Sequence, residues 1–266
     1  MLLHMKDGNR FVWQSGFPER LQGEGFAVVT IDLRGHGESK AGGAGVGAPA
    51  GGNANQPDDK KKGAPRRPTA AGPKLRPGDV QAMTEDLDAV KGFLLKEHQA
   101  LKLNIARLGI VGPEMGATVA ALFANQDWNA RAYDDGAAGN RTPRGQDVKA
   151  IVLISPQKAF DGVNMVPALH ALRTPEWNVA FLVCVGKSDP LDKGQANQLF
   201  NNLKALPRND QRMYFYTYPA KLRGTDLLGK GLQIEDHMLA FFLRHLKKPE
   251  IPWQDRRPKW DREKKP

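Results

Sequence analysis

The chain has 266 residues, 40% of them hydrophobic, and its formal net charge is +10. This length suits one large α/β domain or two small ones. The single cysteine, Cys184, excludes an internal disulfide framework and a cysteine-cluster metal site. No stretch approaches the roughly 18 consecutive apolar residues of a transmembrane helix. Residues 1–10 are too short and too polar for a signal peptide. We therefore expect a cytoplasmic protein, unless an export signal lies upstream of this start.

Most of the positive charge lies in two segments. Residues 41–77 hold seven Lys or Arg against two Asp, and residues 247–266 hold eight against four acidic residues. Both segments are rich in proline and charge and poor in large aliphatic side chains, so they cannot bury enough apolar area to offset the entropy of ordering. The composition predicts a disordered low-complexity insertion over 41–78 and a basic C-terminal tail over 249–266, on the surface or loose. Residues 1–248 otherwise read as a single domain.

Nucleic-acid recognition needs basic side chains arranged on a folded face. Because the charge lies in segments predicted to be unfolded, we expect no specific nucleic-acid partner. The nucleic-acid alternative predicts steeply salt-dependent binding that is lost when 41–78 is deleted.

The rest of the chain alternates short strands with helices. Continuous apolar runs of strand length occupy 26–31, 107–111, 148–154, 179–185 and 213–218, and Leu2-Leu3 resembles the end of another strand. Continuous rather than alternating hydrophobicity indicates strands covered on both faces, as in a parallel sheet. Apolar residues at helical spacing lie between the strands, and three such faces are Met83-Leu87-Val90-Leu94, Met115-Val119-Leu122-Phe123 and Ile234-Met238-Phe241-His245. The pattern predicts a doubly wound α/β fold with a mainly parallel sheet of about six strands.

Ligands of open α/β sheets bind beyond the carboxyl ends of the strands. The predicted strand 26–31 and the turn after it form the string aromatic-x-Val-x-x-x-Asp-x-Arg-Gly-His-Gly-x-Ser over residues 26–39. The turn after the predicted strand 107–111 reads Gly-Pro-Glu-Met-Gly over residues 112–116. With the turns at 186–190 and 223–225, these motifs resemble the α/β-hydrolase superfamily, in which a nucleophile elbow, an acid turn and a base turn follow in this chain order. The resemblance implies an α/β-hydrolase-like sheet lacking the first two strands of the full fold.

The resemblance places the triad-equivalent positions at Glu114, Asp189 and Arg223, so the serine and the histidine of the family are replaced. It also places the oxyanion-hole N–H groups at Met115 and Met5. Arginine stays protonated and cannot act as the base. We expect Arg223 to bridge the two carboxylates as an ion-pair cluster, with the Glu114 carboxylate filling the oxyanion hole. The alternative is that Glu114 and Arg223 point separately into water.

Other polar residues near the predicted site have structural interpretations beside functional ones. His237 is the one stand-in for a base, whereas His36 belongs to a structural turn and Cys184 to a buried strand. Lys6, Asp7 and Asn9 are ligand contacts or a polar turn, and Ser155 is a turn hydroxyl.

Two functions remain open at this point. The first is a catalytically inactive hydrolase-like protein, or pseudoenzyme, that binds a small molecule or a protein partner. The second is an active esterase- or peptidase-like hydrolase with an unconventional site based on Glu114. Neither requires a cofactor or a metal ion, and we expect none.

Overall fold

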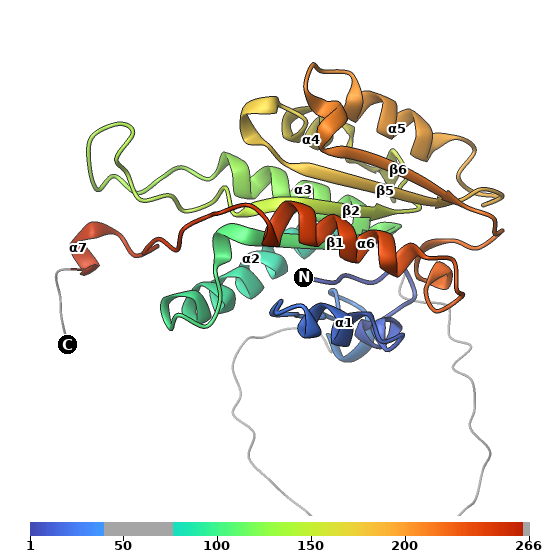
Figure 1. Ribbon diagram of the computed structural model, residues 1–266, viewed down its shortest axis with the longest axis horizontal. Coiled ribbons are helices and arrows are strands. Elements are labelled where there is room, and N and C mark those ends of the chain that lie inside the picture. Colours follow the sequence, from blue (N-terminus) through green and yellow to red (C-terminus); the bar gives the residue numbers. More distant parts are fainter. Residues whose placement is uncertain (40–76, 263–266) are drawn as a thin grey trace, which may run out of the picture.

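The computed structural model describes residues 1–39 and 77–262, and its centre is a four-stranded parallel sheet (Figure 1). The strands are β1 (Leu108–Pro113), β2 (Val148–Ile154), β5 (Ala180–Gly186) and β6 (Met213–Tyr218), in the order β1-β2-β5-β6. A separate antiparallel hairpin is formed by β3 (Ala159–Phe160) and β4 (Val163–Asn164). The α/β class and the parallel sheet predicted from the sequence are confirmed.

Helices cover both faces of this sheet. One face packs against α2 (Pro77–Gln99), α3 (Met115–Asn129), α4 (Val166–Leu172) and α5 (Gln195–Lys204). The other packs against α1 (Phe17–Gly23) and α6 (Ile234–Phe242), which continues as a π-helical turn at Leu243–Lys247. The short remaining helices are the 3-10 turns Arg10–Trp13, Gly37–Ser39, Ile105–Arg107, Pro175–Trp177, Asn209–Gln211 and Gly224–Leu227, and α7 (Lys259–Arg262). None of the described helices is long and apolar enough to cross a bilayer.

The expectation of about six strands was wrong for the segment 26–31 and for Leu2-Leu3. Leu2 makes only isolated parallel bridges, to Thr30 on one side and to Val111 on the other. The Leu2 N–H donates to the Val29 carbonyl at 2.9 Å. Residues 26–31 are half-buried or exposed instead of covered on both faces. Residues 26–31 lie at the edge of the sheet, and the segment beside them is the short stretch around Leu2. This neighbour offers too few backbone hydrogen-bond partners for a regular ladder, although the apolar run of 26–31 resembles that of a central strand.

The predicted insertion over 41–78 lies outside the described residues, except for Pro77 and Gly78, with which α2 begins. The tail is described as far as Arg262 and lies against the domain. Trp253 stacks on His98 with ring centroids 4.9 Å apart, and its indole N–H donates to the His98 carbonyl at 3.0 Å. The tail therefore contributes side chains to the packing of α2.

A buried ion cluster ties the tail to the domain. Lys91 of α2 bonds Asp127 of α3 and lies 2.8 Å from Asp147, which also accepts a hydrogen bond from Arg256 of the tail. All four side chains are at most 7% exposed. Burial of such charges destabilises the folded protein unless the charges are paired. Here two cations balance two carboxylates.

We expect Arg256→Ala to lower the free energy of unfolding by about 3 kcal/mol, because Asp127 and Asp147 would then share one cation in a buried site. Urea denaturation measures the change. The control is Arg257→Ala, since Arg257 forms an exposed pair with Asp255 and its removal costs about 0.5 kcal/mol or less. Equal losses in the two variants would contradict a special role of the buried cluster.

Candidate functional site

Glu114 occupies a sharp turn between β1 and α3. Its backbone has φ 51° and ψ −108°, which a residue other than glycine rarely adopts. A Cβ on Gly112 would lie 2.2 Å from the Gly116 carbonyl oxygen, and a Cβ on Gly116 would lie 2.8 Å from the His4 carbonyl oxygen. Both positions therefore require glycine, and this close packing forces the turn that exposes residue 114 at the carboxyl end of the sheet.

The structure brings Glu114, Asp189 and Arg223 together. The Arg223 Nε donates to Glu114 Oε1 at 2.7 Å, and its Nη1 donates to Asp189 Oδ2 at 2.8 Å. The side chains of Glu114 and Arg223 are 16% and 12% exposed, and that of Asp189 is fully buried. One guanidinium thus binds two carboxylates by charge-assisted hydrogen bonds, and the cluster carries a net charge of about −1.

Two close approaches hold the loop that carries Arg223. The Gly224 N–H donates to Ser155 Oγ at 2.9 Å, and a Cβ on Gly224 would meet the Met5 sulfur at 2.7 Å. Arg223 also donates from Nη2 to the Ser155 carbonyl at 3.4 Å. The hydroxyl of Ser155 therefore binds the turn that directly follows Arg223, a contact that the sequence did not indicate.

The expected occupation of an oxyanion hole by Glu114 is not observed. Among the described residues, no hydrogen bond joins the Glu114 carboxylate to the backbone N–H of Met115 or Met5, whereas Arg223 binds it at 2.7 Å. The Met115 side chain is fully buried in the core under α3. A cation with several donors attracts the carboxylate more strongly than single backbone amides do.

None of the chain's histidines bonds to Glu114 in the parts that the structure describes. His4 is fully buried; its Nε2 accepts from the Leu33 N–H at 2.9 Å, so Nδ1 donates to the Met5 carbonyl at 2.7 Å. Burial lowers the pKa of His4 to about 4, so both of its nitrogens are committed in the neutral form. His237, the predicted stand-in base, stacks on Tyr216 with ring centroids 4.0 Å apart and bonds Tyr218.

The remaining polar residues singled out from the sequence lie in structural contacts. Lys6 forms a 3.8 Å ion pair with Asp161 of the hairpin, and the Asn9 side chain caps the 3-10 turn that follows. Asp7 has φ 61° and thus occupies a tight turn. His36 contacts the Arg34 carbonyl at 3.0 Å. Burial raises the pKa of the Cys184 thiol to about 12, in agreement with a core position.

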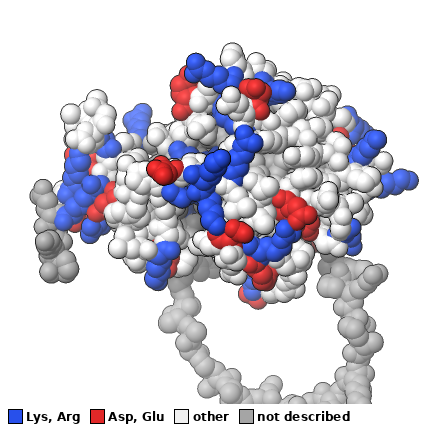
Figure 2. Space-filling view, in the orientation of Figure 1, with Lys and Arg blue, Asp and Glu red and all other residues white. Residues whose placement is uncertain are grey.

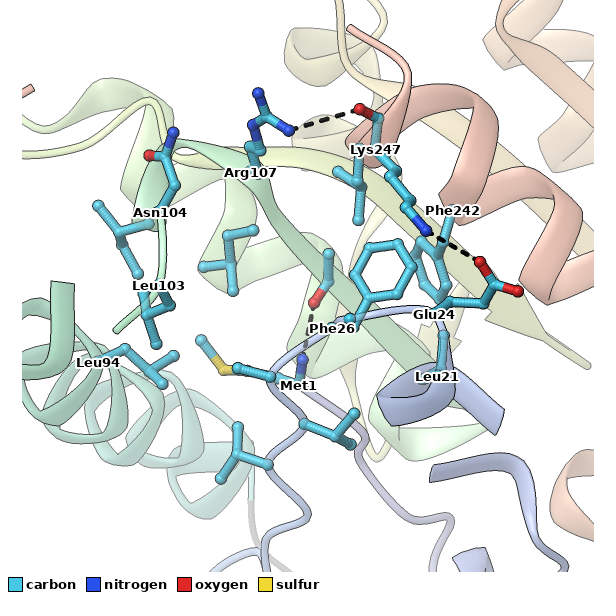
Figure 3. Close-up of a pocket in the computed structure, with 18 of the residues that line it drawn as sticks. Met1, Leu21, Glu24, Phe26, Leu94, Leu103, Asn104, Arg107, Phe242 and Lys247 are labelled. Atoms are coloured by element: carbon cyan, nitrogen blue, oxygen red, sulfur yellow. Dashed lines mark hydrogen bonds and ion pairs between the residues drawn. The ribbon is translucent and has the colours of Figure 1, made fainter. Parts of the chain in front are cut away.

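An apolar cavity, which no sequence pattern predicted, lies at the amino end of β1 (Figure 3). Its volume is about 350 Å³. Phe26 and Phe242 line it with ring centroids 6.4 Å apart, and Leu94 and Leu103 close its far side. A 2.9 Å ion pair between Glu24 and Lys247 stands at its edge. Residues 26–29 line the cavity, but their apolar run is also typical of a buried strand and by itself does not reveal a cavity.

The comparisons with known proteins give no family. No protein-family model matches the chain, and a search of curated proteins finds no match. Within the described residues, no group of three or more His, Cys, Asp or Glu side chains is arranged to hold a metal ion. The fold and the site define an α/β protein with a four-stranded parallel sheet and a carboxylate–arginine–carboxylate cluster at its carboxyl end.

We expect acidification from pH 7 to pH 5 to destabilise the protein by about 2 kcal/mol through His4. The folded pKa of about 4 lies below the ordinary value of 6.5, so the unfolded state takes up the proton first and stability falls as the pH falls. Urea denaturation at both pH values measures this. His4→Gln should reduce the pH dependence, whereas His170→Gln at an exposed position should keep it; the same slope in all three proteins would contradict the assignment.

Proposed function

We propose that this protein is an α/β-hydrolase-like protein without serine-hydrolase chemistry, and that its role is to bind a small apolar molecule. The observation that carries the proposal is the binding of Arg223 to both Glu114 and Asp189, at 2.7 and 2.8 Å. The elbow backbone at Glu114 and the chain order of the three residues support the resemblance to hydrolases. Fold resemblance alone is a weak argument for activity, and the chemistry of the cluster argues against it.

A hydrolase of this type needs a nucleophile that loses a proton and a base that accepts it. Glu114 has a carboxyl group in place of a hydroxyl, and an arginine side chain is too weak an acid to serve as a base after losing its proton. A carboxylate could attack a substrate carbon directly, but hydrolysis of the resulting ester needs a base to activate water. Arg223 occupies the position of that base, and it also neutralises the carboxylate that would attack.

The apolar cavity at the amino end of β1 supports the binding role. Its volume of about 350 Å³ lies within the range of small-molecule sites, and its lining is mostly apolar with a few charged groups at the edge. Glu114, Asp189 and Arg223 do not line it. Binding there leaves the cluster undisturbed, so the proposed ligand is bound without being transformed.

We expect the protein to show no labelling by a fluorophosphonate probe and no more hydrolysis of p-nitrophenyl acetate than its Glu114→Gln variant. Turnover that is lost in Glu114→Gln would contradict the proposal and support the Glu114-based hydrolase.

The double variant Glu114→Ser with Arg223→His places a nucleophile and a base beside Asp189. It should gain fluorophosphonate labelling, with Glu114→Ser alone as the control without a base; an inert but folded double variant would contradict the hydrolase-like arrangement.

We expect 1-anilinonaphthalene-8-sulfonate to bind in the apolar cavity and to become fluorescent. Val28 lines the cavity, so Val28→Phe should fill part of it and weaken binding by about tenfold. Leu191→Phe is the control, since Leu191 is 52% exposed and outside the cavity. Circular dichroism verifies that both variants fold. Unchanged binding in Val28→Phe would place the dye elsewhere and contradict the assignment.

A further inference from the structure

A wide cleft lies at the amino ends of β5 and β6. Its volume is about 900 Å³. Its lining comes from three segments: Pro175, Glu176 and Asn178 before β5, Arg208, Gln211 and Arg212 before β6, and Arg244, His245, Lys248 and Pro249 after α6. Glu114 and Asp189 lie beyond the carboxyl ends of β1 and β5, whereas the cleft lies at the amino ends of the strands. The cleft is therefore separate from the carboxylate–arginine cluster. It also shares no lining residue with the apolar cavity, although both are lined in part by residues at the end of α6 and just after it.

Positive charge dominates this cleft. Four cations, Arg208, Arg212, Arg244 and Lys248, line it against one carboxylate, Glu176. None of these five forms an ion pair within residues 1–39 and 77–262, which the structure describes. Figure 2 shows Lys and Arg side chains gathered across the middle of the molecular face over the end of α6. The cleft carries an excess of about three positive charges that the described side chains do not balance.

One of these cations is fixed in place. Arg212 is 5% exposed, and its guanidinium donates to the carbonyls of Val179 and Arg173 and to Asn209 Oδ1, each at 2.6 Å. Neutral oxygens orient the group but do not cancel its charge, and Glu176, the carboxylate that lines the same cleft, attracts it without forming an ion pair with it. One carboxylate does not balance the four cations, so burial of Arg212 stays unfavourable. A bound anion would offset that cost, and a rigid donor loses little entropy on binding.

A half-buried histidine lies beside these cations. His245 lines the cleft, and its Nε2 lies 3.1 Å from the Tyr214 hydroxyl. Burial, with a smaller contribution from the charge of Arg244, lowers the pKa of His245 to about 4. Arg244 itself lies over the Tyr214 ring, 5.6 Å from its centroid. Arg208, Arg244 and Lys248 are exposed, so their long side chains can turn toward a ligand in the cleft, with Arg244 leaving the Tyr214 ring to do so.

We propose that this cleft binds a small polyphosphate, a compact anion with about three or more negative charges. The forked guanidinium donors match the geometry of phosphate oxygens, and the cleft has ample room for a small polyphosphate with its water shell. A nucleic acid would require basic side chains along an extended track. Here the cations converge on one concave site, which favours the compact anion.

Isothermal titration of the full chain with inorganic tripolyphosphate tests the proposal. We expect one-to-one binding that weakens with added salt, because the contacts are ionic. The triple variant Arg208→Gln, Arg244→Gln and Lys248→Gln should weaken binding by at least about tenfold. It leaves Arg212 and the surrounding loops intact, and circular dichroism confirms folding.

The matched control removes the same charge elsewhere. Lys193→Gln, Lys204→Gln and Lys230→Gln change three exposed lysines outside the cleft, and they should weaken binding by about threefold or less. Equal weakening in the two triple variants would show diffuse charge attraction and overturn the proposal, as would the absence of saturable binding. A single-stranded oligonucleotide that binds more tightly than tripolyphosphate, and loses affinity in the cleft variant, would overturn it in favour of nucleic acid.

Discussion

The bridge from Arg223 to Glu114 and Asp189 is the interaction on which the candidate site depends. It joins the turn after β1 to the loop after β5 through one guanidinium, whose charge does not change with physiological pH. A proton-transferring triad and a fixed ion-pair cluster require different side chains. The first moves a proton between its members, whereas the second holds its loops in one arrangement.

The backbone of the site is determined separately from its chemistry. Gly112 and Gly116 allow the tight turn because a Cβ at either position would clash with a backbone carbonyl oxygen, that of Gly116 or that of His4. The side chain at 114 projects from that turn whatever its type, so exchange of a hydroxyl for a carboxylate leaves the scaffold unchanged. This separation means that the turn constrains the position of the side chain at 114 but not its chemistry.

Much of the sheet could be predicted from the sequence. The runs 148–154 and 213–218 match β2 and β6, because strands within a parallel sheet are covered on both faces and their sequences show it. The run 26–31 has the same appearance but lies at the edge, and its failure to form a strand depends on how few neighbours it has. The proximity of Glu114 and Arg223 was expected from the resemblance to α/β-hydrolases together with the opposite charges of the two side chains. The burial of Arg256 did not, since its partner Asp147 is 109 positions away in the sequence.

That long separation has a consequence for how the molecule is made. Asp127 and Asp147 leave the ribosome well before Arg256, so during synthesis only Lys91 is present to neutralise two carboxylates destined for the interior. The packing of α2 and α3 against the sheet therefore becomes electrostatically complete only when nearly the whole described chain has emerged. A nascent chain stalled before that point would carry a surplus anion in its core and would be a natural client for chaperones.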